Sequence, residues 1–346
     1  MGLFTNNYVV NINIPTNARV LNGDASDMFL HCYNLKSISG LPRGIVNASN
    51  LFMGCNNFNQ PVNIPEGVQN GFRMFYGCNN FNSIVNLPNT IQTLRLAFSS
   101  CNNFNQPLTI PNSVVNMQNM FSRCSEFNSV ITIPEGVTDI GSLFQRCNNF
   151  NQAIQIPNSV QRMSYVVAHC NNFNQPITLP DSLSPGSQSG LFQNCNNFNQ
   201  LVVIPNFITS MSYWFANCKS LTQAPKIPDS VQNLAYAFEN CIKIVTVNIG
   251  RGATDLRYAF VNCNNLSTLR IYSTEVTNAD QMIRYRNNYS RINIFVNNVF
   301  SNTYKTLRNA RLWNTSSGIS WTYDSANSCY YNTQANIYLY YNLTDE

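Results

Sequence analysis

Thiols are the most reactive side chains in this sequence, and their spacing is regular. Of the twelve cysteines, eleven follow one another at intervals of 23 residues, except for one interval of 25 and one of 22. These eleven are Cys32, Cys55, Cys78, Cys101, Cys124, Cys147, Cys170, Cys195, Cys218, Cys241 and Cys263. A thiol can coordinate a metal, form a disulfide, act as a nucleophile or pack as a small apolar side chain.

A catalytic pairing is suggested at one point. The two histidines are His31 and His169, and His169 stands next to Cys170 as a base would stand beside a nucleophile. Cys170 belongs to the regular column, however, where burial would make a thiol inert. No carboxylate pair recurs on a face, no glycine-rich phosphate loop occurs, and no C-x-x-C pair could build a zinc site. We therefore expect no enzyme, no catalytic residue, no metal site and no cofactor.

The elements that position these thiols repeat with the same period. A phenylalanine lies three residues before each cysteine, with Val167 as the exception, and Phe, Leu or Ile lies three residues after it. The averaged coil reads C-N-N-F-N-Q-P-h-x-I-P-x-x-V-x-x-h-x-x-h-F-x-x, in which h is apolar. A fixed period of this length predicts a solenoid, in which each coil buries its apolar residues against its neighbours.

Each part of the coil has its own expected conformation. The h-x-I stretch, for example Leu108-Thr109-Ile110, alternates like a strand with one buried face, and the proline that follows ends it. The V-x-x-h run predicts a second short extended edge, and h-F-x-x-C leaves room for a helical or 3₁₀ turn that directs Phe and Cys inward. We expect a repeat solenoid of about eleven coils, each with a short parallel strand, and a small β-rich C-terminal module.

Stacking of the coils also affects the thiols. Parallel strands lie about 4.8 Å apart, which is within the Cα range of a disulfide. An unbroken ladder of cysteines nevertheless does not divide into obvious pairs. Buried thiols that act as small apolar side chains are the preferred interpretation.

The repeat resembles a known family. The pattern from Ile131 to Phe150 is similar to the BspA-type class of leucine-rich repeats, which is found in bacterial surface proteins. The pieces around Cys78 and Cys124 also resemble the M-F-x-x-C-x-x-F-N repeats of mycoplasma lipoproteins. The resemblance covers residues 28–270 and implies a leucine-rich-repeat-like solenoid and adhesion outside the cell. Most coils have ten residues from Cys to Pro, whereas the common BspA pattern has nine, and only from Cys241 onward does the shorter spacing return.

Both ends of the chain differ from the middle, so we expect three parts. Residues 1–27 hold a half coil that caps the first repeat, and residues 28–270 form the solenoid. Residues 271–346 lose the period and contain ten of the seventeen tyrosines. Alternation over 292–296 and 336–340 predicts strands in this last part, which would be a cap or an attachment module. The piece from Ile292 to Lys305 resembles the closing strand and turn of BspA arrays, through Val299, Tyr304 and Lys305.

Composition excludes several classes of function. Charged residues are 10% of the chain and the net charge is +5, so the sequence has no strong electrostatic footprint for nucleic acid. No run of eighteen apolar residues occurs, so we expect no membrane insertion. The first twenty residues lack a basic region followed by an apolar core, which argues against a secretory signal.

The outward positions of the coils supply the candidate binding residues. Polar residues recur in two columns along the predicted strand. This candidate binding face comprises Gln60, Gln106, Gln152, Gln175, Gln200, Thr109, Thr132, Gln155 and Thr178. An amide-rich face of this kind suits hydrogen bonding to a sugar or a protein, and the alternative is a solvated sheet. A basic column, Arg123, Arg146 and His169, directly precedes the cysteines and could meet an acidic partner or form a solvated ridge.

These features predict a non-enzymatic interaction protein. Because the resemblance implies adhesion while no export signal is found, the leading hypothesis is a bacteriophage structural, decoration or host-adhesion protein that is assembled in the host cytoplasm. Its solenoid would bind a host-surface protein or glycan, and its C-terminal module would bind other virion proteins, with homo-oligomers as a further possibility. The alternatives are a bacterial cell-surface adhesin of BspA type and an intracellular scaffold.

Overall fold

The computed structural model describes residues 8–186, 188–284, 291–297, 301–309, 321–332 and 336–341. The chain divides into two compact units, Met1–Leu183 and Ser184–Glu346, which we call unit 1 and unit 2. The division falls within the one interval of 25 residues, between Cys170 and Cys195. The three-part division expected from the sequence stays a prediction.

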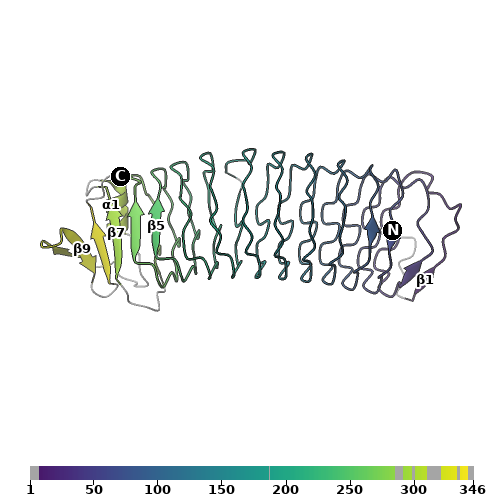
Figure 1. Ribbon diagram of the computed structural model, residues 1–346, viewed down its shortest axis with the longest axis horizontal. Helices are drawn as coiled ribbons and strands as arrows, with labels where there is room; N and C mark the ends of the chain where they lie inside the picture. Colours follow the sequence, from purple (N-terminus) through teal and green to yellow (C-terminus); the bar gives the residue numbers. More distant parts are fainter. Residues whose placement is uncertain are drawn as a thin grey trace. The chain divides into compact units, whose positions relative to one another are not determined.

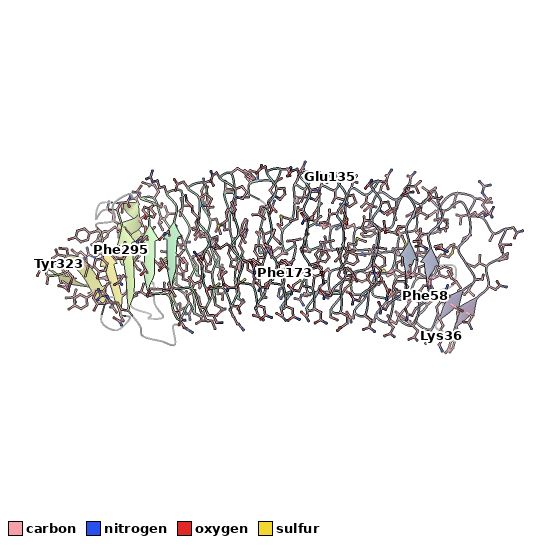
Figure 2. The ribbon with its side chains drawn as sticks, viewed as in Figure 1. Lys36, Phe58, Glu135, Phe173, Phe295 and Tyr323 are labelled. Carbon is pink, nitrogen blue, oxygen red and sulfur yellow. The ribbon has the colours of Figure 1, made fainter. Side chains whose placement is uncertain are left out.

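Unit 1 is a stack of coils (Figure 1). Two phenylalanine columns form its interior. Phe52 stacks on Phe75 of the next coil with ring centroids 5.2 Å apart, and on Phe58 of its own coil at 4.6 Å. Phe58 and Phe173 lie inside the stack, whereas Glu135 lies at its margin (Figure 2). Such offset stacks add to the hydrophobic stabilisation that burial alone provides. The predicted inward direction of these columns is confirmed.

The strand edge of unit 1 alternates between buried and exposed residues in most coils, as predicted, but only a few neighbouring coils pair there as β-strands. Parallel pairs form between β1 (Asn11–Ile12) and β2 (Ser37–Ile38), and between β3 (Val62–Asn63) and β4 (Val85–Asn86). In the later coils of unit 1 the h-x-I stretch is extended, with its first apolar residue buried and its central residue exposed, but it is not paired as a strand. The coil prolines remove backbone donors from this edge.

A second edge runs along the coils as predicted. One residue per coil pairs in parallel with its equivalent in the next coil through an isolated bridge. The series in unit 1 is Asp24, Asn47, Asn70, Thr93, Asn116, Asp139 and Arg162. Unit 2 has its own series, Ser210, Asn233, Asp255 and Asn278.

The prediction of a helical or 3₁₀ turn before each cysteine is wrong. This segment is a run of β-turns in which left-handed residues recur, for example Asn50 with φ 55° and Gly54 with φ 75°. Alternate N–H groups close the turns, as from Cys55 to the Phe52 carbonyl, and the others point to the next coil. Four such N–H groups, those of Ala48, Asn50, Phe52 and Gly54, donate to backbone oxygens of the next coil over 2.8–2.9 Å. A helix would have directed these donors along its own axis.

The thiols have a defined structural role in this turn. The twelve cysteines are buried, and the structure holds them as thiols rather than disulfides. Cys124 Sγ donates to the Phe98 carbonyl oxygen of the preceding coil over 3.0 Å, and Cys147 Sγ repeats the contact with Phe121. Burial raises the pKa of the Cys124 and Cys147 thiols well above their usual range. The column cysteines are therefore small apolar side chains, and most of them also supply one buried donor.

We expect the native column thiols to be unreactive. Because the thiolate is the reactive species, burial and a raised pKa should prevent alkylation. Iodoacetamide followed by mass spectrometry should find the column cysteines unmodified in the native protein and all twelve alkylated in guanidinium. Stoichiometric alkylation of Cys124 in native protein would contradict this assignment.

Unit 2 begins with coils of the same type and ends in one six-stranded sheet (Figure 1). Phe192, Phe215, Phe238 and Phe260 form the corresponding inner aromatic column of unit 2, with centroids 5.3–5.7 Å apart. The sheet has the order β5-β6-β7-β10-β9-β8. Its strands are β5 (Thr246–Ile249), β6 (Thr268–Ile271), β7 (Ile292–Val296), β8 (Thr322–Asp324), β9 (Cys329–Asn332) and β10 (Ile337–Tyr340).

The C-terminal strands continue the sheet of the last coils. β7 pairs in parallel with β6, so that Leu269 lies opposite Ile294, and β10 pairs in parallel with β7. The strands predicted over 292–296 and 336–340 are thus confirmed. Tyr304 and Lys305, expected in a closing turn, instead lie in α1 (Asn302–Asn309), whose first turn is capped by Ser301 Oγ. Val299 lies outside the described residues.

Candidate functional site

The outward side chains of the strand edge in unit 1 form what we call the strand face. Its polar column occupies the position eight residues after each cysteine. Thr109, Thr132, Gln155 and Thr178 occupy this position on consecutive coils, and all four are exposed. No charged residue occurs in the column, which continues through Asn63 and Asn86. It offers a row of neutral hydrogen-bonding groups, spaced by the coil repeat.

The glutamines of the other predicted column are held within the fold. Gln106, Gln152 and Gln175 are half-buried, and the side-chain amide of each donates to an asparagine of the preceding coil over 3.1–3.3 Å. Gln60 donates to the Ile38 carbonyl oxygen over 2.9 Å. Gln200 is half-buried in unit 2. These amides therefore serve first as coil-to-coil links, with part of their hydrogen-bonding capacity left for a ligand.

Sequence reasoning missed an exposed apolar column on the strand face. It lies six residues after each cysteine, between the glutamines and the polar column. Its members are Pro61, Ile84, Pro107, Val130, Ala153 and Pro176, and all are exposed. Val130 keeps 66% and Ile84 50% of its surface accessible. The signal was present in the repeat, because no charged and no polar residue occupies this position from Pro61 to Pro176.

The basic column lies on another part of unit 1. Arg123 and Arg146 are exposed and His169 is half-buried, and all three adopt left-handed backbone conformations with φ near 60–66°. Burial, and then the charge of Arg146, lower the pKa of His169. The column therefore carries two charges at neutral pH, from the arginines, rather than three. The Cys170 thiol donates inward to the Phe144 carbonyl oxygen, so it is not poised as a nucleophile beside His169.

The lowered pKa of His169 can be tested directly. His169 should become protonated only below the pH range of an ordinary histidine. Its contribution to folding stability is therefore present above the pKa of the unfolded state. This contribution is lost as the pH falls through the lower pKa of the folded state. NMR titration of the imidazole should show Arg146→Gln raising the pKa, but only in part, because burial is the larger cause. Arg123→Gln is the matched control and should shift it less. An unchanged pKa in Arg146→Gln would contradict the proximity of the two groups.

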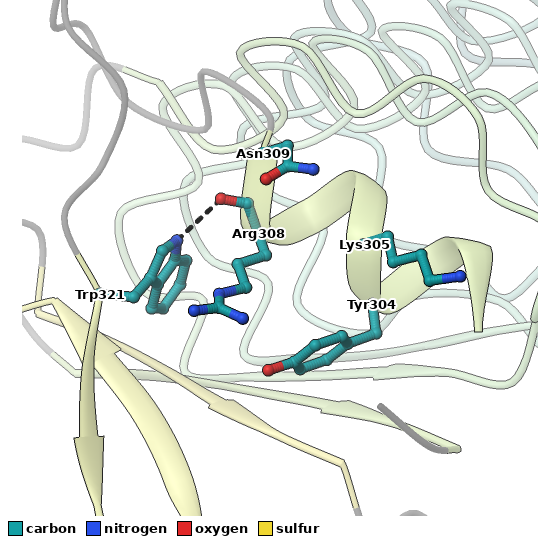
Figure 3. Close-up of a pocket in the computed structure, with 5 residues that line it drawn as sticks. All are labelled: Tyr304, Lys305, Arg308, Asn309 and Trp321. Carbon is teal, nitrogen blue, oxygen red and sulfur yellow. Dashed lines mark hydrogen bonds between the residues drawn. The ribbon is translucent and has the colours of Figure 1, made fainter. Parts of the chain in front are cut away.

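A small pocket near the C-terminal end of the chain carries cationic and aromatic groups (Figure 3). It encloses about 320 Å³ between α1 and Trp321, with Tyr304, Lys305, Arg308 and Asn309 as its other lining residues. Trp321 Nε1 donates to the Arg308 carbonyl oxygen over 3.0 Å. Burial raises the pKa of Tyr304 to about 12, so this phenol stays protonated at neutral pH. The pocket contains no acid and base pair.

Two general features of the described residues bear on function. Over the ranges given above, no three His, Cys, Asp or Glu side chains converge as a metal site would require. Within the same ranges, no helix has the length and apolar character needed to cross a membrane.

Comparison with known families now decides the classification. The family described as BspA type leucine rich repeat region matches residues 1–128, 47–174 and 212–334, which together exceed half of the chain. The chain belongs to the BspA-type leucine-rich-repeat family. The resemblance found in the sequence is thereby confirmed. A family described as mycoplasma protein of unknown function, DUF285, matches residues 134–228 of this BspA-type protein.

Solved structures similar to this BspA-type protein are also leucine-rich-repeat proteins. One, a leucine-rich repeat protein from Bacteroides ovatus ATCC 8483, is 19% identical with a TM-score of 0.57, over 84% of this chain and 79% of the other. A leucine rich cell surface protein from Faecalibacterium prausnitzii A2-165 is 20% identical with a TM-score of 0.43, over 75% of this chain and 87% of the other. No curated protein matches the chain. The first likeness supports the solenoid fold.

Proposed function

We propose that this BspA-type protein is a non-enzymatic adhesin displayed at a bacterial cell surface, and that the strand face of unit 1 binds a protein on a partner cell. The observation that carries the proposal is the exposed apolar column, which runs over six consecutive coils from Pro61 to Pro176. Contiguous apolar surface of this kind marks interaction sites in soluble proteins.

The surroundings of the apolar column favour a protein partner. The centres of protein interfaces are depleted of charge and rimmed by polar groups. Here the apolar column lies between the half-buried glutamines and the uncharged column of Thr109, Thr132 and Thr178. A regular repeat also presents equivalent positions at a regular spacing, as solenoid interaction surfaces do. Family membership adds support, because repeats of this type are found in bacterial surface proteins.

The test introduces charge into the strand face. Val130→Glu places a carboxylate within the apolar column, and Val115→Glu is the matched control, because Val115 is also exposed, at 48%, but lies outside this column. Binding of fluorescently labelled protein to a panel of intact cells is measured by flow cytometry. We expect Val130→Glu to lower binding at least about tenfold, since a desolvated carboxylate without a partner is costly at an interface.

Treatment of the cells identifies the partner class. Loss of binding after trypsin treatment, with binding retained after periodate oxidation of glycans, would support a protein partner. The reverse result would assign the strand face to a glycan instead. Equal binding by wild type and Val130→Glu would refute use of this face.

A bacteriophage virion protein is the second candidate. The observation that favours it is the set of twelve buried thiols without a disulfide, because this state suits a protein that folds in a reducing cytoplasm. Mass spectrometry of gradient-purified virions from producing cells tests it. The chain at stoichiometric amounts would support this candidate, and its restriction to the cell envelope fraction would support the adhesin.

A further inference from the structure

One coil of unit 2 is shorter than its neighbours and presses against the coil before it. The interval from Cys241 to Cys263 is 22 residues, and Gly250 takes the place that a proline holds in the preceding coils. A Cβ atom on Gly250 would lie 2.6 Å from the Pro228 carbonyl oxygen, and one on Gly252 would lie 2.0 Å from that of Asp229. Only glycine allows two backbones to approach this closely.

A groove of about 740 Å³ lies beside this shorter coil. Residues 223–229 of one coil supply one wall, and β5 with the turn after it supplies the other. Seven of its lining residues carry polar side chains that can meet a ligand: Gln223, Lys226, Asp229, Thr246, Asn248, Arg251 and Tyr272. The volume falls within the range of small-ligand sites, about 300–1,000 Å³.

Electrostatics distinguish this groove from the strand face of unit 1. Lys226 and Arg251 contribute two cations, and both residues are exposed. The single carboxylate, that of Asp229, already accepts a hydrogen bond from the Arg251 backbone N–H over 2.7 Å. On the same sheet, the Arg270 guanidinium of β6 lies over the Phe295 ring, 5.7 Å from its centroid. The groove is therefore positively charged, whereas the strand face of unit 1 is neutral.

The combination of groups fits a particular ligand chemistry. The amides of Gln223 and Asn248 can pair with hydroxyl groups, and the half-buried ring of Tyr272 offers an aromatic edge and a phenol. Lysine and arginine bind carboxylates and sulfates through charge-assisted hydrogen bonds. We propose that this groove binds an acidic saccharide, one that carries carboxylate or sulfate groups. The site lies in unit 2 and is independent of the strand face, so either assignment can fail without the other.

The experiment measures binding of two labelled probes, hexagalacturonate and a heparin hexasaccharide, by fluorescence anisotropy. We expect the full chain to bind at least one of them, and Lys226→Gln/Arg251→Gln to weaken that binding about tenfold or more, as the loss of close charge pairs does. The matched control is Lys219→Gln/Lys243→Gln, which removes two exposed cations of the same unit from outside the groove. The control should bind within about twofold of wild type.

The outcome depends on which probe binds and on which variant loses affinity. Preference for hexagalacturonate assigns a carboxylated ligand, and preference for heparin assigns a sulfated one. The proposal is overturned if neither probe binds, if the groove variant binds like wild type, or if the control loses as much affinity. It is also overturned if neutral maltohexaose, or single-stranded DNA of equal charge, binds as tightly as the acidic saccharides. Thermal unfolding of each variant confirms that the fold is retained.

Discussion

Replacement of Phe104 by alanine is expected to lower the free energy of unfolding by about 3–5 kcal/mol, the range for a large aromatic removed from a packed core. Phe104 is fully buried. Its ring stacks on Phe98 of the same coil at 4.6 Å and on Phe81 and Phe127 of the adjacent coils at 5.9 and 6.0 Å. The truncation therefore opens a cavity, interrupts the column to which Phe104 belongs and removes its contact with Phe98 of the other column. Neighbouring coils cannot collapse into it, because backbone hydrogen bonds fix their spacing.

Phe72→Ala is the matched control for this change. Phe72 is half-buried and lies outside both columns, where its ring contacts the guanidinium groups of Arg73 and Arg95 at 4.9 and 5.5 Å. Surface cation–π contacts contribute about 0.5–1 kcal/mol, so the control should lose far less stability. Urea unfolding followed by circular dichroism measures both variants. Equal losses would show that the inner columns do not dominate the stability of unit 1.

The inner architecture could be predicted from sequence because it is the repeating part. Phe, Cys and Pro recur in phase, and an inward position tolerates few residue types, so the columns identify the core and the strand edge. The mixed sheet at the C-terminal end was only partly predictable. Alternation over Ile292–Val296 indicated a strand, but its parallel pairing with β6 depends on a partner distant in sequence.

The turn before each cysteine was not predicted because glycine or asparagine occupies its left-handed positions in only some of the coils. Leu96, Arg123 and Tyr165 all have positive φ, although glycine and asparagine are the usual residues there. These conformations persist because each coil directs a series of N–H groups to the next, which outweighs the local cost. A single coil has no such partner, so local propensity does not predict these left-handed conformations.

The candidate site was predicted in part for a related reason. Outward polar positions such as Thr109 and Thr132 follow directly from strand alternation. The amide of Gln106, by contrast, is engaged by Asn82, whose position in the preceding coil cannot be inferred from one coil alone. The groove beside β5 arises from a single missing residue, and its chemistry depends on which side chains the shorter coil brings together. Departures from the repeat therefore carry more functional information than the repeat itself.

Gly252→Ala is expected to destabilise unit 2 by about 3 kcal/mol or more, at the upper end of overpacking substitutions. The added methyl group would lie 2.0 Å from the Asp229 carbonyl oxygen and 3.2 Å from its carbonyl carbon. Both atoms belong to the backbone, so no rotamer change can relieve the clash. The preceding coil would have to move, although Arg251 N–H holds it through Asp229 Oδ1.

Substitutions at two other glycines distinguish the effect of a steric clash from the general cost of replacing glycine. A Cβ atom on Gly40 would meet nothing within 4 Å, so Gly40→Ala should leave stability within about 0.5 kcal/mol of wild type. Gly77 is equally open but has φ 72°, so Gly77→Ala should cost about 1–2 kcal/mol through conformation alone. If denaturant unfolding shows the largest loss of stability for Gly252→Ala, a smaller loss for Gly77→Ala and the smallest for Gly40→Ala, the short coil is held by close backbone contact. A Gly252→Ala variant as stable as Gly40→Ala would mean that the shorter coil does not press on Asp229, and the groove beside it would then lose its structural basis.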